Sequence, residues 1–205
     1  MSGKTDGDIG DRIAERVRQL RSERGYSLDV LAGRSGVSRS AISMIERRET
    51  SPTAVVLDKL ATGLGVPLAS LFDTRAADGE PEPEPTPVAR RSDQPRWRDP
   101  GSGYLRRSIS PPAWPSPIRI ADVELPAGGN VSYDNAERDL QIYQQVWVLD
   151  GELEVTVGTA THRLDEGDCL AMELDAPTGF RNRTDRSARY AVVVVTQPRT
   201  GRRTS

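Results

Sequence analysis

The sequence contains very few of the side chains that build disulfides, metal centres and membrane spans. Cys169 is the single cysteine among 205 residues, which excludes an internal disulfide and suits a reducing compartment. No apolar run approaches the roughly 18 residues that a membrane helix needs. The first residues also lack the apolar core of a secretory signal. These absences predict a cytoplasmic protein without a membrane partner.

Histidine is equally scarce, since His162 is the only one in the chain. Zinc, iron and copper sites in proteins are built mainly from imidazole and thiolate ligands. His162 stands apart from other ligand types, ahead of a turn-forming stretch, so it is interpreted as a turn or surface residue. We therefore expect no metal and no cofactor.

Negative charge dominates overall, but it is unevenly distributed. The formal net charge is −2. Positive charge is in excess within the first 72 residues and in the short tail that begins at Gln197, whereas residues 97–196 are acidic. A polyanionic partner is therefore expected at the two ends of the chain and not along its middle.

Three stretches that differ in periodicity and composition follow one another along the chain, and they predict an α + β protein of two domains. Residues 9–72 show helical periodicity with short turns. Residues 73–96 are rich in proline and charge and have almost no large apolar groups, so a flexible linker is predicted. Residues 97–196 show alternating strand patterns broken by turn residues. The basic tail, residues 197–205, is predicted to be disordered.

The first region predicts five helices. The first runs from about Ile9 to Arg24, followed by Gly25. Ser27 and Ser38 are good N-caps for the second and third helices. Ser51 with the following proline predicts the start of a fourth helix, and "PLASLF" predicts a short fifth.

The second and third helices are joined by the short turn "SGVS", which is the geometry of a helix-turn-helix. The string "VLAGRSGVSRSAISMIERRETSPTAVVLDKLATGLGV" closely resembles the phage-repressor-like (xenobiotic-response-element type) helix-turn-helix family. The resemblance covers nearly all of residues 9–72. It implies that the third helix enters the major groove of double-stranded DNA, and that the protein acts as a dimer on a palindromic operator.

The resemblance also implies roles for individual residues. It places Arg39, Ser40, Ser43 and Met44 against base edges. An arginine at that position can hold a guanine with two hydrogen bonds, whereas a methionine offers apolar contact, for instance to a thymine methyl group. The residues placed against DNA phosphates are Ser27, Ser38, Arg47 and Arg48.

An ion pair between Arg21 and Glu46 is implied by the same resemblance, and it would hold the recognition helix in place. Two alternatives stay open at this point. Arg47 and Arg48 fit plain surface charge as well as they fit phosphate contacts. A helical domain of this kind can also bind a protein instead of DNA, which its modest positive charge permits but does not favour.

The last region is typical of a β-sandwich or small barrel. Its hairpin "VLDGELEV" contains Asp-Gly, a favoured pair for a tight turn. Together with "EGDCLAM", this hairpin resembles the cupin fold over residues 118–196, which implies an antiparallel jelly-roll barrel. Residues 97–117 fit less well and are predicted to be a lead-in strand or strap.

Metal-binding cupins carry two histidines and a glutamate before the glycine turn, and a third histidine before a later asparagine. Counting back from Gly151 and Asn182 assigns these positions to Asp139, Gln141, Gln144 and Thr178. This set suits neither a transition metal nor calcium.

What remains is an apolar cavity with a few polar groups, the usual form of a small-molecule site. The alternative is a barrel filled by its own side chains, which serves dimerisation only. The residues predicted to line the small-molecule cavity are Asp139, Gln141, Gln144, Val146, Met172, Thr178 and Phe180.

These expectations combine into a repressor-like transcriptional regulator that binds a DNA operator as a homodimer and senses a small-molecule effector without a transition metal. The opposite strand face, with Tyr143, Trp147 and Leu149, is a natural subunit contact, and Cys169 is expected on a core strand. One alternative is an antitoxin-like DNA-binding protein whose barrel mediates only dimer or partner contacts. Another is a cupin isomerase or dioxygenase tethered to DNA. The missing ligands argue against catalysis, so no enzyme activity is expected.

Overall fold

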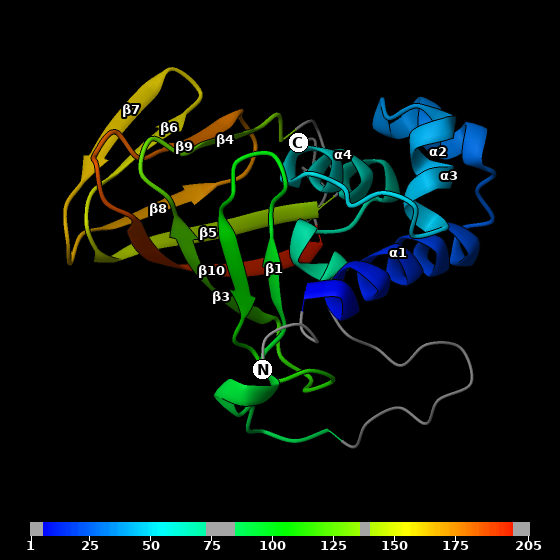
Figure 1. Ribbon diagram of the computed structural model, residues 1–205, viewed down its shortest axis with the longest axis horizontal. Helices are drawn as coiled ribbons and strands as arrows, with labels where there is room; N and C mark the ends of the chain where they lie inside the picture. The colour runs from blue at the N-terminus through cyan, green and yellow to red at the C-terminus, as the bar shows by residue number, and fades with distance from the viewer. Residues whose placement is uncertain (1–5, 73–84, 136–139, 199–205) are drawn as a thin grey trace, which may run out of the picture.

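Helical periodicity in the first third of the chain produces four α-helices in the computed structural model, which describes residues 6–72, 85–135 and 140–198 (Figure 1). They are α1 (Asp6–Glu23), α2 (Leu28–Ser35), α3 (Arg39–Glu46) and α4 (Ala54–Leu64). Most of the apolar side chains at helical spacing face the core, whereas Val30, Met44 and Val55 are exposed. The fully buried ones include Ile13, Val17, Leu31, Ile42, Leu57, Leu60 and Leu64.

Local capping sets the limits of the helix-turn-helix. The Ser27 hydroxyl accepts a hydrogen bond from Val30 N at 3.2 Å, and the Ser38 hydroxyl accepts one from Ala41 N at 3.2 Å. Gly36 closes α2 with φ 67°, a left-handed conformation that glycine adopts without strain. Both predicted caps are therefore confirmed.

Two helix predictions are wrong. The predicted fifth α-helix is a 3₁₀ helix, η1 (Leu68–Leu71). Its amides bond three residues back, as Ser70 N does to Pro67 O at 2.9 Å, because four residues are too few for an α-helical ladder. The cap of α4 is Thr53 instead of Ser51, since its hydroxyl reaches Val56 N at 3.3 Å.

The rest of the described chain forms two antiparallel sheets. The six-stranded sheet has the order β1 (Arg96–Arg98), β2 (Leu105–Ser108), β3 (Ile118–Leu125), β10 (Ala188–Pro198), β5 (Leu140–Asp150) and β8 (Cys169–Glu173). The four-stranded sheet has the order β4 (Asn130–Tyr133), β9 (Thr178–Arg181), β6 (Leu153–Val157) and β7 (Ala160–Leu164).

The inner faces of the two sheets form the core of this half. Val146 and Val148 on β5 are buried, as are Val155 on β6 and Phe180 on β9. Among the described strands, no pairing joins one sheet to the other, so a closed barrel is not formed. Most connections between consecutive strands lead from one sheet to the other, whereas the hydrogen bonds between strands stay within each sheet.

Residues on either side of the predicted linker belong to folded elements. Residues 73–84 of that linker lie outside the described residues, as do residues 199–205 of the predicted tail. Residues 85–96, predicted as linker, include the 3₁₀ helix η2 (Arg91–Asp93) and the first residue of β1. The predicted lead-in segment supplies β1 and β2, which form the edge of the six-stranded sheet nearest α1 (Figure 1).

One strand prediction fails at Cys169, which is exposed instead of buried. It lies directly opposite Trp147 in the β5–β8 register, so it belongs to the outward face of the sheet.

The helices and the sheets share an interface. The Phe72 ring at the end of η1 lies 5.5 Å from the Trp97 ring of β1, and Trp97 lies 5.7 Å from Tyr104. All three side chains are buried. The two halves are therefore packed on one another by an aromatic cluster that joins residues far apart in the sequence.

Candidate functional site

The recognition helix α3 is held by its buried face and by one ion pair. Ile42 and Ile45 are buried against the helical core. Arg21 on α1 donates two hydrogen bonds to Glu46, from Nε to Oε1 at 2.7 Å and from Nη2 to Oε2 at 2.8 Å. The hydrogen bond with Glu46 raises the pKa of Arg21. The ion pair implied by the family resemblance is confirmed, and it fixes the orientation of α3 relative to α1.

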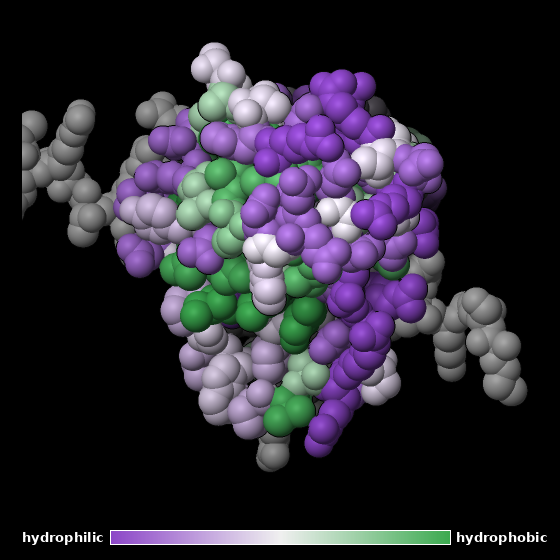
Figure 2. All heavy atoms as spheres, turned by 90° about the vertical axis from the view of Figure 1, so that its left-hand side faces the viewer, coloured by the Kyte–Doolittle hydropathy of each residue, from purple (hydrophilic) through white to green (hydrophobic). Residues whose placement is uncertain are grey.

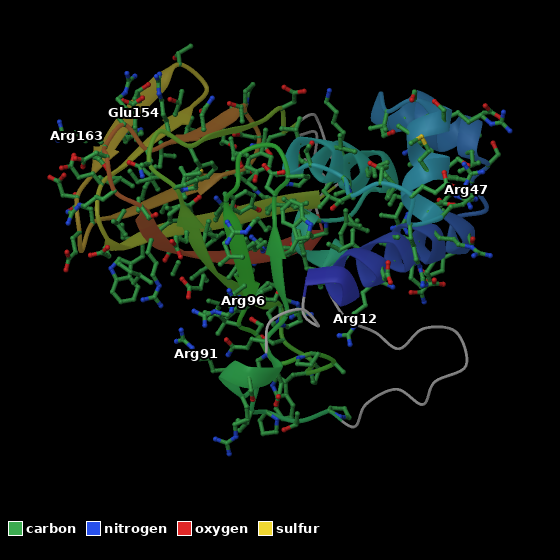
Figure 3. All side chains as sticks on the ribbon, viewed as in Figure 1. Arg12, Arg47, Arg91, Arg96, Glu154 and Arg163 are labelled. Carbon is green, nitrogen blue, oxygen red and sulfur yellow. The ribbon has the colours of Figure 1, made fainter. Side chains whose placement is uncertain are left out.

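The opposite side of α3 lines a surface groove. Its lining consists of Leu28 of α2 together with Arg39, Ser40, Ser43, Met44 and Arg47. Figure 3 shows Arg47 at the helical end of the molecule, far from Glu154 and Arg163 at the end of the sheets. The structure thus brings five of the eight predicted DNA-contacting residues into one concave surface.

Charged groups in this groove are solvated. The Arg39 side chain is 66% exposed, and its Nε lies 3.4 Å from Oδ1 of the equally exposed Asp29. Exposed pairs of this kind contribute little, so Arg39 is available to another partner. Arg47 forms a similar exposed pair with Glu49 at 3.0 Å.

The other three predicted residues lie beside the groove. The exposed hydroxyls of Ser27 and Ser38 stand at the first turns of α2 and α3, where helix N-termini favour anions. Arg48 follows α3 with φ 63° and turns back to α1, where its Nη2 lies 3.0 Å from Glu15 Oε2. Its side chain therefore points away from the groove lining.

A second site is a partly open cavity of about 70 Å³ between the helices and the sheets. From the helical half it is lined by Asp58 of α4 and by Pro67, Leu68 and Ala69 around η1. The sheets supply the remaining walls: Tyr104, Arg106, Val123, Tyr133, Asn135, Ile142, Gln144, Leu174, Thr178, Phe180, Tyr190, Val192 and Val194.

Three of the seven predicted pocket residues, Gln144, Thr178 and Phe180, line this cavity. Val146 and Met172 face the same interior but lie outside its lining, in the core between the sheets. Asp139 lies outside the described residues.

Gln141 is absent from the lining for a geometric reason. Ile142, Gln144 and Val146 are buried on β5, so the odd-numbered residues face outward. Gln141 and Gln144 are three residues apart, and two residues at that spacing cannot share a face of a regular strand. The spacing taken from metal-binding cupins therefore does not fit this strand.

Polar groups in the cavity form a network of hydrogen-bond donors. The amide nitrogen of Asn135 donates hydrogen bonds to Thr178 Oγ1 at 2.8 Å and to Ala176 O at 3.0 Å. Burial raises the pKa of Tyr104, Tyr133 and Tyr190, so their hydroxyls stay protonated near neutral pH.

Arg106 is the cavity residue that sequence reasoning missed most clearly. It is 9% exposed, and its guanidinium carbon lies 5.0 Å from the centre of the Phe72 ring. Its Nε is buried without a hydrogen-bond partner. The signal available in the sequence was weak, since Arg106 lies on a strand of only four residues.

Asp99 is a second residue that sequence reasoning missed, and it connects the two halves. Its Oδ1 accepts a hydrogen bond from Ala54 N, the first amide of α4, at 2.9 Å. Its Oδ2 accepts one from Ser102 N at 2.8 Å. The carboxylate is only 3% exposed, so it acts as a buried cap that the sheet half provides to the helical half.

Two further findings concern the described residues as a set. Residues 6–72, 85–135 and 140–198 contain no cluster of three His, Cys, Asp or Glu side chains arranged for a metal ion, and His162 is exposed on β7. The helices in the same ranges are too short or too polar to span a bilayer.

Comparison with known proteins identifies both halves. Residues 17–71 match the helix-turn-helix family model, and residues 122–195 match the cupin domain model. The HTH-type transcriptional regulator SutR of Escherichia coli is 26% identical over 87% of this chain and 91% of its own length.

A shorter match covers 64 residues of the chain. The HTH-type transcriptional regulator SinR of Bacillus subtilis is 41% identical over 31% of this chain and 58% of its own. Among solved structures, an HTH_3-family transcriptional regulator from Vibrio cholerae aligns with a TM-score of 0.70 at 24% identity. That alignment covers 95% of this chain and 100% of the other, so the two share their fold.

Proposed function

The chain joins a helix-turn-helix domain to a cupin domain, and from this premise we propose that it is a sequence-specific transcriptional regulator whose cupin half pairs two copies and senses a small molecule. The observation that carries DNA binding is the groove, in which α3 presents one arginine, two serines and one methionine at its exposed face. The helix-turn-helix family model covers that region, and the regulators SutR and SinR are similar to this chain.

Within the groove, Arg39 is the residue that reads a base. It stands at the first position of α3, and the N-terminal residues of a recognition helix are those that reach base edges. Its pair with Asp29 is solvated, so it can open at small cost when a guanine edge is offered. Ser27, Ser38 and Arg47 hold the flanking phosphates.

A second copy of the chain binds through the outward side of the six-stranded sheet. We name this surface the outer sheet face. Two aromatic side chains, Tyr143 and Trp147, are exposed on that surface, and Trp147 is 50% exposed. Tyr143 lies opposite Val195 of β10. Figure 2 shows apolar side chains gathered into a connected area on one side of the molecule. The outer sheet face consists of Ile118, Ile120, Tyr143, Trp147, Val193 and Val195.

Such a surface suits a homodimer, because large exposed apolar patches on soluble proteins mark interaction sites. One recognition helix covers only a half-site, so two paired copies are needed to read a palindrome.

Effector sensing belongs to the cavity between the halves. Its walls include Asp58, Pro67 and Leu68 from the helical half, so a molecule bound there touches both halves at once. A ligand shifts the position of the DNA-reading helices only if it binds one arrangement of the halves better than another. A cavity made by both halves has this property, because its shape changes when they move.

A catalytic role is not proposed. In metal-binding cupins, the positions of Gln144 and Thr178 belong to histidine or glutamate ligands, whereas amide and hydroxyl groups are poor ligands for transition metals. The alternative in which the cupin half only pairs two copies is favoured by one observation, the small volume of the cavity. In that case no small molecule alters operator affinity.

The test is selection of DNA sequences by the full chain from a randomised double-stranded library. We expect a palindrome with half-sites about one helical turn apart. R39A should weaken binding to it by about 10- to 100-fold and relax the preference at one base position in each half-site. R163A is the matched control, since Arg163 is an equally exposed arginine at the opposite end of the molecule.

Enrichment without any sequence preference, or equal effects of R39A and R163A, would refute sequence-specific reading by α3. A palindrome bound with unchanged preference by R39A would place base reading on other residues.

A further inference from the structure

We propose that the cavity between the helices and the sheets binds a small monocarboxylate, with Arg106 as the residue that holds its carboxylate group. This inference rests on the proposed role of the cavity as an effector site and names the chemistry of the effector. The observations that carry it are the unsatisfied charge of Arg106, the donors around it, and the size and walls of the cavity.

The charge of Arg106 is unusual for a buried group. Arginine remains protonated in proteins, and burial of an unpaired charge is costly. Within residues 6–72, 85–135 and 140–198, no carboxylate forms an ion pair with Arg106, and its buried Nε donates no hydrogen bond. A side-chain hydrogen bond with Tyr104 and stacking over Phe72 at 5.0 Å offset only part of this cost. An anion in the cavity would satisfy the guanidinium.

The neighbour of Arg106 on β2 shows what a structural arginine looks like in this protein. Arg107 forms an ion pair with Asp122 of β3, and Arg189 of β10 binds the same carboxylate at 2.9 Å. Arg107 and Arg189 are thus satisfied within the fold. Arg106 faces the cavity instead.

Three tyrosine hydroxyls and an amide surround Arg106, and the Tyr133 hydroxyl is hydrogen-bonded to Tyr104. The hydroxyls of Tyr104, Tyr133 and Tyr190 line the same cavity, and burial raises the pKa of each, which keeps the proton on oxygen. The amide of Gln144 lies on the same wall. Protonated hydroxyls beside a guanidinium are suited to carboxylate oxygens, which only accept hydrogen bonds.

Size and charge narrow the ligand class further. A cavity of 70 Å³ holds on the order of five water-sized groups, which corresponds to a carboxylate with a two- or three-carbon body. Ile142, Val192 and Val194 give that body apolar walls. Asp58 also lines the cavity. Arg106 offers a single positive charge to the ligand, so a monoanion is preferred over a dianion, whose second charge would stay unpaired.

The experiment uses propionate as the probe and its uncharged isostere propionamide as the control. The full chain, dialysed into chloride buffer of constant ionic strength, is followed by thermal unfolding and by isothermal titration calorimetry. We expect propionate at about ten times its Kd to raise the unfolding midpoint by about 3–6 °C. Propionamide should leave it unchanged.

Two variants separate an anion site from a structural arginine. R106Q should abolish the response to propionate, whereas R107Q should lower the midpoint of the free protein and retain the response. R106M, which removes the unsatisfied charge and keeps the stem, should leave the midpoint of the free protein equal or higher. R107M should lower it, because Asp122 loses a partner.

Several outcomes overturn the proposal. Equal responses to propionate and propionamide mean that the site does not read charge. A response that persists in R106Q removes Arg106 from the site. No response to propionate, together with a fall of the R106M midpoint as large as that of R107M, makes Arg106 a structural residue.

Operator affinity, measured with and without propionate, separates this proposal from the proposed function. Binding of propionate without a change in operator affinity leaves the ligand class intact and refutes effector control. Sequence-specific operator binding by a chain that binds no carboxylate leaves the regulator intact and refutes the ligand class.

Discussion

The groove on α3 and the cavity between the halves are built in opposite ways. The groove comes from one segment, residues 28–47, whereas the cavity takes its walls from residues between 58 and 194. Their arginines differ as much, since the Arg39 side chain is 66% exposed and Arg106 is 9% exposed. A solvated charge is held at little cost and can serve a large polyanion. A buried one is costly and is expected only where a small, specific partner satisfies it.

The largest difference between the groove and the cavity is expected from a substitution in the outer sheet face. W147E places a charge at the centre of the proposed subunit contact, so it should give a monomer by light scattering. Loss of the second half-site should then weaken operator affinity by about 1,000-fold. Propionate binding should be unchanged, because Trp147 faces away from the cavity. The groove loses its function in this variant while the cavity keeps its own.

The control for this prediction is H162E, which adds the same charge at an exposed position of the other sheet. Cys169 gives a second readout, since it is the only cysteine and lies opposite Trp147 in the sheet register. Its reaction with a maleimide should be faster in W147E than in H162E. A W147E protein that remains dimeric, with Cys169 still protected, would place the subunit contact elsewhere.

The same contrast explains what the sequence could predict. Ser27 and Ser38 cap helices through amides three residues away, so local pattern was sufficient to place α2, α3 and the groove. Gln144, Thr178 and Phe180 could be assigned to the cavity because strand alternation and the cupin resemblance agreed there. The error at Gln141 arose where a family spacing was used in place of the two-residue period of a strand.

The other walls of the cavity could not be predicted, because they depend on how the halves meet. Asp58 lies on a helix and Arg106 on a strand 48 residues later, and nothing local links them. Arg106 lies in a short strand, and Tyr104 directly precedes it, within the segment that resembled a cupin least. A charged residue on such a strand is expected to be exposed, whereas this one is buried beside the Phe72 ring, which packs against Trp97.

An intermediate effect is expected at Asp99, whose carboxylate connects the helical half to the sheet half. D99A removes the buried acceptor of Ala54 N and of Ser102 N, so it should lower the free energy of unfolding by about 2–3 kcal/mol. It should also weaken propionate binding, because α4 and β1 are no longer connected beside the cavity. Operator preference should be retained, since α3 makes no contact with Asp99. Urea unfolding and DNA selection measure the two effects.

D93A serves as the control for D99A, because Asp93 is an exposed aspartate of η2. Equal losses of stability in the two variants would show that the buried cap contributes nothing beyond an ordinary surface carboxylate.

The smallest effect is expected at Asp122, which lies in the sheet half alone and so should affect neither region directly. Burial would raise the pKa of Asp122, but hydrogen bonds from Arg189 and Arg107 outweigh it, and the pKa lies below its ordinary value. A carboxyl with a lowered pKa in the folded state stabilises the fold above its unfolded pKa of about 4. That contribution is lost as the pH falls through the folded pKa.

D122N should therefore lower the free energy of unfolding by about 1–2 kcal/mol at pH 7. The difference from the unsubstituted protein should shrink as the pH falls below about 4, because both chains then carry a neutral group there. Urea unfolding at several pH values measures it. E154Q is the control: Glu154 pairs with Arg183 at the surface, where solvent screening leaves little stabilisation. A D122N difference that stays constant down to pH 3 would mean that Asp122 acts through shape and hydrogen bonding alone, and that its charge does not hold Arg107 and Arg189 in place.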